Sequence, residues 1–223
     1  MTPDVVIGAS QIAAILGIDR FQTAEQLFRR MLGLEPREPE NEHMVRGQML
    51  EDGLCRWWAH LARAERRETQ HRSAGRILDN GQLQVRHPEL PWARATPDLI
   101  ALGYPVGSSD SDGMLLAVDV KCPNSGRVKV GEQWVASWSE ATQTAPRGYV
   151  VQSIYQQGVL RAAGVPVEAG ELAAGPLWGR LERVAVPFDA ELFALTLTRA
   201  TAFRACVLAG VLTDDFKGEQ NNV

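Results

Sequence analysis

The chain has 223 residues, of which 45% are hydrophobic and 22% charged, and its formal net charge is −4. This size and mix predict one globular domain over 1–223, and no apolar run reaches the ~20 residues of a transmembrane helix. The first ten residues lack the basic and apolar regions of a signal peptide, so we expect a cytoplasmic protein. A negative net charge does not exclude DNA binding, because one face or channel can still be basic.

Cysteine and histidine usage limits the kinds of metal site. Three cysteines lie far apart with no C-x-x-C, and four histidines show no zinc-ligand spacing. This argues against a disulfide framework, a four-cysteine cluster and a structural zinc site. If a metal is bound, carboxylates should bind it, which favours Mg²⁺ or Mn²⁺.

The first half of the chain is predicted to hold helices followed by short strands. Ser10 precedes the short amphipathic helix QIAAILGI as its N-cap, and Thr23 opens a second helix that ends at Gly33. An acidic, proline-containing loop (35–42) leads to a long helix over about 43–66. Strands are expected at about 75–79, 82–86, 92–95 and 98–102.

The second half alternates strands and helices. A flexible turn (107–113) precedes the strand LLAVDVK, and 129–142 is predicted as a helix with Trp134 and Trp138 one turn apart. A strong helix follows Pro146 and ends at Gly164, then come a strand (179–189), a closing helix (189–209) and a polar tail expected to fray from about 214. The order predicts an α/β fold, a central mixed β-sheet flanked by helices in one domain.

The strand LLAVDVK carries two opposite charges on one face. Successive side chains alternate in a strand, so Asp119 and Lys121 lie side by side. Burying either charge alone is costly. One interpretation is a salt bridge at the rim of the sheet. Another is a reactive site. The chain has only three lysines and takes almost all its other positive charge from arginine, so a lysine beside Asp119 is informative.

Two further carboxylates are candidates on less evidence. Glu51 lies three residues before Leu54 and seven before Trp58, so it shares their helix face, while Asp52 turns outward. Asp98 follows Pro97 at the start of a strand. Glu51 could also be a rim residue of a tilted helix, and Asp98 could be a turn-capping aspartate.

Taken together these segments predict a metal-dependent nuclease hairpin. Asp98 and Asp119 on adjacent strands could share a divalent cation, with the backbone carbonyl of Val120 as a third oxygen. Lys121 could orient the attacking water or help to deprotonate it. The metal would polarise the phosphoryl oxygen and lower the pKa of that water.

The pair Pro97-Asp98 followed by Asp119-Val120-Lys121 resembles the PD-(D/E)xK nuclease superfamily with its restriction-endonuclease-like core. Five segments, in order, are more specific, and they are similar to the phage lambda-type exonuclease family, also called the YqaJ-type viral recombinases. The resemblance runs from about residue 7 to 164. The segments are IGASQIAAILG, RGQMLED, ATPDLIA, DVKCP and GYVVQ.

The resemblance implies a Mg²⁺-dependent exonuclease (or Mn²⁺-dependent) that degrades one strand of linear double-stranded DNA from the 5′ end. It also implies a ring-shaped homotrimer that works with a single-strand-annealing recombinase in phage or prophage recombination, inside a bacterial host cell. Two alternatives remain: a structure-specific or restriction-type endonuclease on the same core, and a DNA-binding module that has lost catalysis.

Carried over by the resemblance, Asp98, Asp119 and the Val120 carbonyl hold the principal metal. Glu51 completes the site or holds a second metal, and Lys121 serves the nucleophile. Tyr149 and Gln152 match the family's Y-x-x-Q, and Gln156 continues that stripe one turn on. The stripe could contact water or a DNA phosphate, although such a stripe can also be a solvated helix face. Two further residues are candidates for DNA contact: Ser10 as a hydroxyl at a helix N-terminus and Arg46 before the long helix.

The sequence departs from the family pattern at two places. Asp119 stands where lambda-type members often carry glutamate, so the metal would sit slightly closer to the strand. The family's upstream Trp and Arg, the latter linked to recognition of a 5′-phosphate, have no counterpart in MTPDVV. Another arginine, such as Arg29 or Arg30, would then have to take that role.

Overall fold

The computed structural model describes residues 5–36, 39, 41–69, 76–79, 81, 83–103, 114–123, 127–130, 133–136, 138–139, 143–175 and 180–217. Helices are η1 (Ala9–Gln11), α1 (Ile12–Ile15), α2 (Ala24–Met31), α3 (Glu42–Thr69), α4 (Arg147–Ala162), α5 (Ala190–Ala209) and η2 (Asp214–Phe216). Strands are β1 (Ile7–Gly8), β2 (Arg76–Asp79), β3 (Val85–Arg86), β4 (Ala93–Ala95), β5 (Leu99–Gly103), β6 (Met114–Lys121), β7 (Arg127–Val130), β8 (Gln133–Ala136), β9 (Ala169–Ala174) and β10 (Glu182–Pro187).

The main sheet has the strand order β10-β9-β6-β5-β2. Its centre is the parallel pair β6–β9, and the other neighbours are antiparallel. A small sheet, β1-β4-β3, and the hairpin β7-β8 complete the described strands. The prediction of a mixed α/β fold is therefore confirmed.

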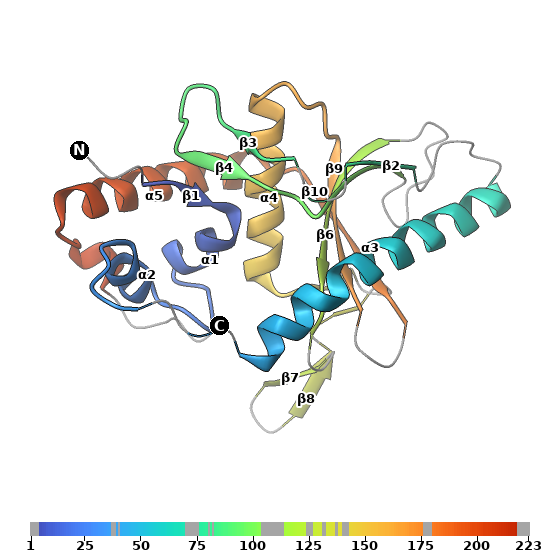
Figure 1. The fold of residues 1–223 in the computed structure, drawn as a ribbon, viewed down its shortest axis with the longest axis horizontal. Coiled ribbons are helices and arrows are strands. Elements are labelled where there is room, and N and C mark those ends of the chain that lie inside the picture. The colour runs from blue at the N-terminus through green and yellow to red at the C-terminus, as the bar shows by residue number, and fades with distance from the viewer. Residues whose placement is uncertain are drawn as a thin grey trace.

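Helices cover both faces of the main sheet (Figure 1). On one face α3 packs Leu54 and Trp58 against strand residues such as Leu116 and Val118. On the other face lies α4, which also contacts α1 and α5. Because α4 is enclosed by the sheet and by these helices, most of its second and third turns are buried, including the polar residues Gln156 and Gln157. Helix α4 is therefore the central, most enclosed helix among those described.

A buried ion pair lies between α3 and the sheet. The Arg183 Nε donates to Glu171 Oε1 at 2.6 Å and its Nη2 donates to Oε2 at 3.0 Å. Trp58 Nε1 donates to the same Oε1 at 2.5 Å, and all three side chains are at most 2% exposed. Since each buried charge is both paired and hydrogen-bonded, the group can persist in an apolar interior.

Strand β9 was not predicted, although it neighbours the central strand β6. Its sequence, AGELAA, has no β-branched or aromatic residue, so its composition does not favour a strand. The structure supplies the reason: a Cβ at Gly170 would overlap Gln157 and Ser153 of α4. Close approach of α4 therefore requires glycine at position 170, and all six residues of β9 are buried.

The helix predicted over 129–142 is wrong. Arg127–Val130 and Gln133–Ala136 pair as the antiparallel strands β7 and β8, with Val128 opposite Val135 and Lys129 opposite Trp134. The alternating, β-branched sequence of RVKV and QWVA favours this pairing over a helix. Trp138 lies beyond the hairpin and is 5% exposed.

Two terminal predictions also differ from the structure. Ser10 is not a helix N-cap: it is exposed and lies inside the turn η1, which begins after Gly8. The tail does not fray at 214, because η2 forms there and Phe216 packs edge-to-face on Phe203 with ring centroids 5.4 Å apart. In contrast, Thr23 is the predicted N-cap, accepting from Gln26 N–H at 3.1 Å.

Helix α5 is the one described helix that is long and apolar enough to cross a membrane, with a mean hydropathy of 1.4. This differs from the prediction that no such run exists. In the structure α5 is a helix of the core, because Phe203, Cys206 and Val207 are buried in the main hydrophobic cluster. Length and composition alone do not establish a membrane span.

We predict that Glu171→Ala lowers the free energy of unfolding by about 3–5 kcal/mol, because it leaves the Arg183 guanidinium buried without its partner. The double variant Glu171→Leu/Arg183→Met should recover most of that loss. Urea unfolding of the single and double variants measures both effects. A cost below about 1 kcal/mol for the single variant would contradict the importance of the pair.

Candidate active site

The candidate site lies where β5 begins and β6 ends. Leu99 pairs with Val118 in antiparallel register, so the next position along places Asp98 opposite Asp119. This neighbourhood is the predicted one, with carboxylates on adjacent strands. The hydrophobic strands that follow Asp98 and precede Asp119 fix both side chains at the same edge of the sheet.

Asp119 and Lys121 share a strand face, as the alternation predicts. The Lys121 Nζ lies 3.7 Å from Asp119 Oδ2 and 3.9 Å from Asp98 Oδ2. Asp119 is 2% exposed, whereas the side chains of Lys121 and Asp98 are 19% and 20% exposed. The ammonium therefore sits beside both carboxylates in a partly buried cluster.

The backbone of Val120 faces Asp98. Its N–H donates to Asp98 Oδ2 at 2.7 Å. The carbonyl of the next residue, Lys121, accepts from Gly175 N–H at 3.0 Å on the opposite, β9 side. Because strand carbonyls alternate in direction, the Val120 carbonyl lies on the Asp98 side, where the predicted third oxygen ligand should be.

Two glutamines of α4 reach the site from above the sheet. Gln152 Nε2 donates to Asp119 Oδ2 at 3.2 Å, so this predicted residue does lie in the cluster. Gln156 is 3% exposed and donates to the Thr96 carbonyl at 3.5 Å. The prediction that Gln156 contacts DNA does not fit this burial, and its contact instead holds the segment that leads into Asp98.

Glu51 approaches the site from α3. It shares the helix face of Leu54 and Trp58 but is exposed, because this end of α3 extends past the buried contact. Its charge acts on both Asp98 and Lys121. Glu51 is thus at the mouth of the cluster rather than pointing inward into the core.

The electrostatics of the site are dominated by buried negative charge. Burial, together with the charge of Asp119, raises the pKa of Asp98 to about 7 from an ordinary 3.8. Burial and nearby acids, first Asp98 and then Glu51, raise the pKa of the Cys55 thiol to about 12. Burial acts to lower the pKa of Lys121, but Asp119 and Asp98 outweigh it and raise it above its ordinary value.

These residues fit a divalent cation. Asp119 Oδ1 is buried and has no hydrogen-bond partner among the described residues, so one carboxylate oxygen is free for a ligand. Hard cations such as Mg²⁺ prefer carboxylate and carbonyl oxygens. Within the described residues, however, no group of three His, Cys, Asp or Glu side chains converges closely enough to hold a metal. Two aspartates and a carbonyl are the core of the donor set, and Glu51 is more distant.

The other predicted contacts are dispersed. Ser10 lies at the surface in η1, outside the cluster of aspartates and lysine. Arg46 is five residues before Glu51 and so on a different face of α3, and its buried Nε and Nη2 have no hydrogen-bond partner in the described part of the chain. Arg29, proposed as a substitute arginine, is paired with Glu35 at 2.5 Å.

Tyr149 lies beside Lys121, a contact the sequence did not predict. The Lys121 Nζ is 5.6 Å from the centroid of the Tyr149 ring. The same ring stacks on Trp138, with centroids 5.5 Å apart and planes inclined by 24°. No local pattern in the sequence joins Trp138 to Lys121.

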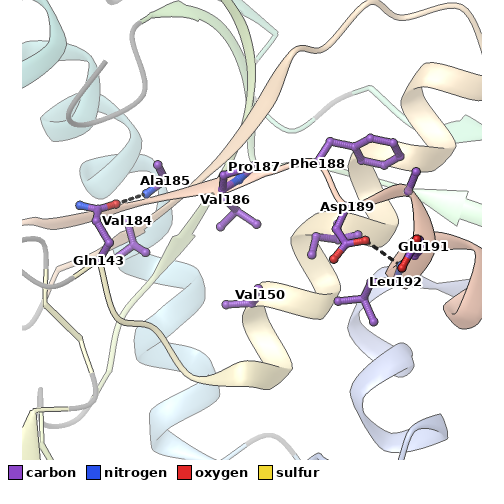
Figure 2. A pocket seen from close by; sticks show the side chains of 12 residues that line it. Gln143, Val150, Val184, Ala185, Val186, Pro187, Phe188, Asp189, Glu191 and Leu192 are labelled. Carbon is purple, nitrogen blue, oxygen red and sulfur yellow. Dashed lines mark hydrogen bonds between the residues drawn. The ribbon is translucent and has the colours of Figure 1, made fainter. Parts of the chain in front are cut away.

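A separate groove of about 610 Å³ lies at the outer edge of β10. Figure 2 shows Gln143, Val150 and Leu192 among its lining side chains, with Gln143 Oε1 accepting from Ala185 N–H at 2.7 Å. The groove contains neither aspartate of the candidate site. Its lining offers no cluster of ionisable groups suited to catalysis, so the active-site candidate remains the strand ends.

The fold that brings Asp98, Asp119, Lys121 and Gln152 together is similar to the fold of solved exonuclease structures. The solved structures support this fold. An alkaline exonuclease from Laribacter hongkongensis is similar with a TM-score of 0.58 and 18% identity, over 92% of this chain and 89% of that one.

A second structure of the same exonuclease, in complex with dAMP, matches with the same TM-score and identity over 93% of this chain and 90% of that one. A phage-related exonuclease from Haemophilus somnus 129PT has a TM-score of 0.55 and 12% identity, over 92% of this chain and 94% of that one. The resemblance to lambda-type exonucleases is therefore confirmed at the level of the fold. No family model and no curated protein matches the sequence.

We predict that Asp98→Asn stabilises the metal-free protein. Because the pKa of Asp98 is raised by folding, the unfolded chain loses this proton near pH 4 and the folded protein only near pH 7. The carboxyl therefore costs stability that grows over this interval and is constant above it. The variant should gain roughly 1–3 kcal/mol at pH 8 and almost nothing at pH 3.5.

Chemical denaturation of both proteins in chelator, at several pH values, measures this difference. An equal gain at all pH values would contradict the electrostatic cause. A destabilised variant at pH 8 would mean that the Asp98 carboxylate is favourably paired even without a cation.

Proposed function

We propose that the protein is a divalent-metal-dependent exonuclease that degrades one strand of linear double-stranded DNA in the 5′-to-3′ direction. The observation that carries the proposal is the convergence of Asp98, Asp119 and Lys121 at one edge of the sheet, within an exonuclease-like fold. The dAMP complex of the Laribacter exonuclease shows that a protein of this fold binds a mononucleotide.

Asp98, Asp119 and the Val120 carbonyl would hold Mg²⁺ or Mn²⁺, and Glu51 would face the same cation or a second one from the mouth. When bound, the cation would polarise the phosphoryl oxygen and lower the pKa of a water molecule. In the reaction, a water oxygen adds to phosphorus and the bond from phosphorus to the 3′-oxygen breaks. The products are a 5′-mononucleotide and a strand with a new 5′-phosphate.

The chain's own groups have distinct roles in this scheme. The Lys121 ammonium, 3.7 Å from Asp119, would orient the water and offset the charge of the phosphate. Gln152 donates one amide hydrogen to Asp119 Oδ2, which leaves Oδ1 for the cation. Fixing the ligand in this way limits its rotation, which benefits a site that must hold a small ion in a defined geometry.

DNA contacts would come from Tyr149 at this edge and from Ser10 and Arg46 outside the cluster. The Arg46 guanidinium, whose Nε and Nη2 have no hydrogen-bond partner among the described residues, suits a backbone phosphate, since arginine can donate two parallel hydrogen bonds to phosphate oxygens. Ser10 is exposed and can donate to phosphate from its hydroxyl. Tyr149, half-buried beside Lys121, could contact the terminal nucleotide with its exposed edge.

By resemblance we also propose a homotrimer that acts with a single-strand-annealing recombinase in the cytoplasm of a bacterial host. A ring of three subunits would let a protein of net charge −4 direct its basic surfaces into one central channel. The outer surface of the ring would then carry the net negative charge.

We predict that the protein releases nucleotides from 5′-labelled linear duplex DNA with Mg²⁺ or Mn²⁺ and leaves closed circular DNA intact. Asp119→Asn should lower the rate by about a thousandfold or more, because it removes a ligand charge without changing side-chain size. End-labelled digestion over time measures this. Cleavage of circles would indicate an endonuclease, and binding without any cleavage would indicate an inactive DNA-binding module.

Glu51 and its neighbour Asp52 form a matched pair for testing the mouth of the site. Glu51→Gln should lower the rate by roughly tenfold to a hundredfold and weaken Mn²⁺ binding in calorimetry, because its charge acts on Asp98 and Lys121. Asp52→Asn, on the outward face, should change the rate less than about twofold. Equal effects of the two substitutions would exclude a specific role for Glu51.

The proposed trimer predicts a solution mass near three times the 24.5 kDa of the chain. Light scattering coupled to gel filtration, over a tenfold range of protein concentration, measures it. A monomer that is nevertheless active would remove the ring from the proposal while leaving the nuclease assignment in place.

A further inference from the structure

We propose that Trp138 is a positioning residue: it fixes the ring of Tyr149, and that ring holds the Lys121 ammonium over the two aspartates. This inference deepens the proposed function, since it takes Lys121 as the residue that serves the nucleophile. The Trp138–Tyr149–Lys121 series is formed by three segments that are distant in the sequence, namely the end of β6, the loop after β8 and the first turn of α4.

Lys121 needs a constraint beyond its two aspartates. Its Nζ lies 3.7 and 3.9 Å from them, which is longer than a hydrogen bond, so charge attraction holds the ammonium without fixing its direction. A lysine side chain has four rotatable bonds and a strongly hydrated head group. The Tyr149 ring at 5.6 Å supplies a third contact, of cation–π type, which restricts that freedom.

Tyr149 in turn needs a support. It lies in the first turn of α4, where its N–H donates to the Pro146 carbonyl at 3.0 Å, and its side chain is only half-buried. A ring at such a place could rotate away from Lys121. The Trp138 ring, with its centroid 5.5 Å away and its plane inclined by 24°, stacks on the Tyr149 ring and restricts that rotation.

Trp138 is suited to that task because it is itself firmly held. It is 5% exposed and belongs to a hydrophobic cluster with Ile154, Leu172 and Val184. Leu172 is the register partner of Asp119, so the same cluster lies directly beside the carboxylate that Lys121 contacts. The indole thus links Tyr149 to buried side chains of β9 and β10.

The segment that carries Trp138 is also tied at its other end. Ser139 and Thr144 exchange two backbone hydrogen bonds of 2.9 Å. The Gln143 side chain accepts from Ala185 N–H and donates to the Arg183 carbonyl at 3.4 Å, along the outer edge of β10 (Figure 2). These contacts hold the chain that follows Trp138 against the outer edge of β10.

The first test compares Trp138→Leu and Trp138→Phe with Trp92→Leu. Trp92 is a matched control, because it is 8% exposed and lies in a different cluster. Trp138→Leu should lower kcat about tenfold with KM for DNA little changed, and Trp138→Phe should recover most of it. Trp92→Leu should lose stability without this loss of kcat. Similar kcat values for both leucine variants would overturn the proposal.

The second test does not depend on activity. The chain has three lysines, Lys121, Lys129 and Lys217, so labelled lysine side chains give three sets of NMR signals. The ε-CH₂ signal of Lys121, assigned by its loss in Lys121→Arg, should be shifted upfield by the Tyr149 ring. Tyr149→Leu should abolish the shift, Tyr149→Phe should keep it, and Trp138→Leu should reduce it.

The outcomes separate this inference from the proposed function. If the wild-type protein cuts no DNA but Trp138→Leu moves the Lys121 signal, the nuclease proposal fails and the positioning stands. If the protein is active and Trp138→Leu leaves both the signal and kcat unchanged, Trp138 is a core residue only and the inference fails. Should Trp138→Leu not fold, Trp138→Met takes its place: a reduced upfield shift of the Lys121 signal would support the inference, and an unchanged signal with unchanged kcat would overturn it.

Discussion

The constraint on which the rest of the site depends is the burial of two carboxylates side by side. Asp98 and Asp119 occupy opposite positions of an antiparallel pair, and burial together with the charge of Asp119 disfavours ionisation of Asp98. Every neighbouring contact reduces this cost: Lys121 adds a positive charge, Val120 N–H bonds one carboxylate and Gln152 bonds the other. Together these three contacts maintain two neighbouring carboxylates in a position that would be unfavourable without them or a bound ligand.

Two buried carboxylates can be kept side by side only if the sheet that positions them resists local distortion. Directly behind the site, the face of the sheet toward α3 holds the Glu171–Arg183 pair capped by Trp58, with no exposed charge. Breaking that pair would leave a buried charge, so the strands cannot slide past each other or separate locally at low cost. The face of the sheet toward α3 therefore carries a fully hydrogen-bonded ion pair, and the strand ends carry the cluster of Asp98, Asp119 and Lys121 with its excess negative charge. The buried ion pair stabilises the strands that position this cluster.

The sequence predicted those parts of the structure in which local pattern and tertiary packing agree. The alternation in LLAVDVK was enough to place Asp119 beside Lys121, and Thr23 was enough to mark a helix start. It failed where packing overrides propensity. AGELAA forms a strand although its composition does not favour one, and neither the close contact of Gly170 with α4 nor the Trp138–Tyr149 stack has any signal in nearby residues. Gln156 was misread because burial of a polar stripe depends on how the whole helix is enclosed.

The charges explain why a divalent cation suits this edge better than a monovalent one. Three carboxylates, Asp98, Asp119 and Glu51, act on Lys121, whose single ammonium leaves two negative charges uncompensated when all are ionised. One of the carboxylate oxygens is buried with no hydrogen-bond donor in the described residues. Additional lysines or arginines could balance the charge but would fill the space that a substrate needs. A small dication balances it within the space of one atom, and the remaining coordination positions stay open to water and phosphate oxygens.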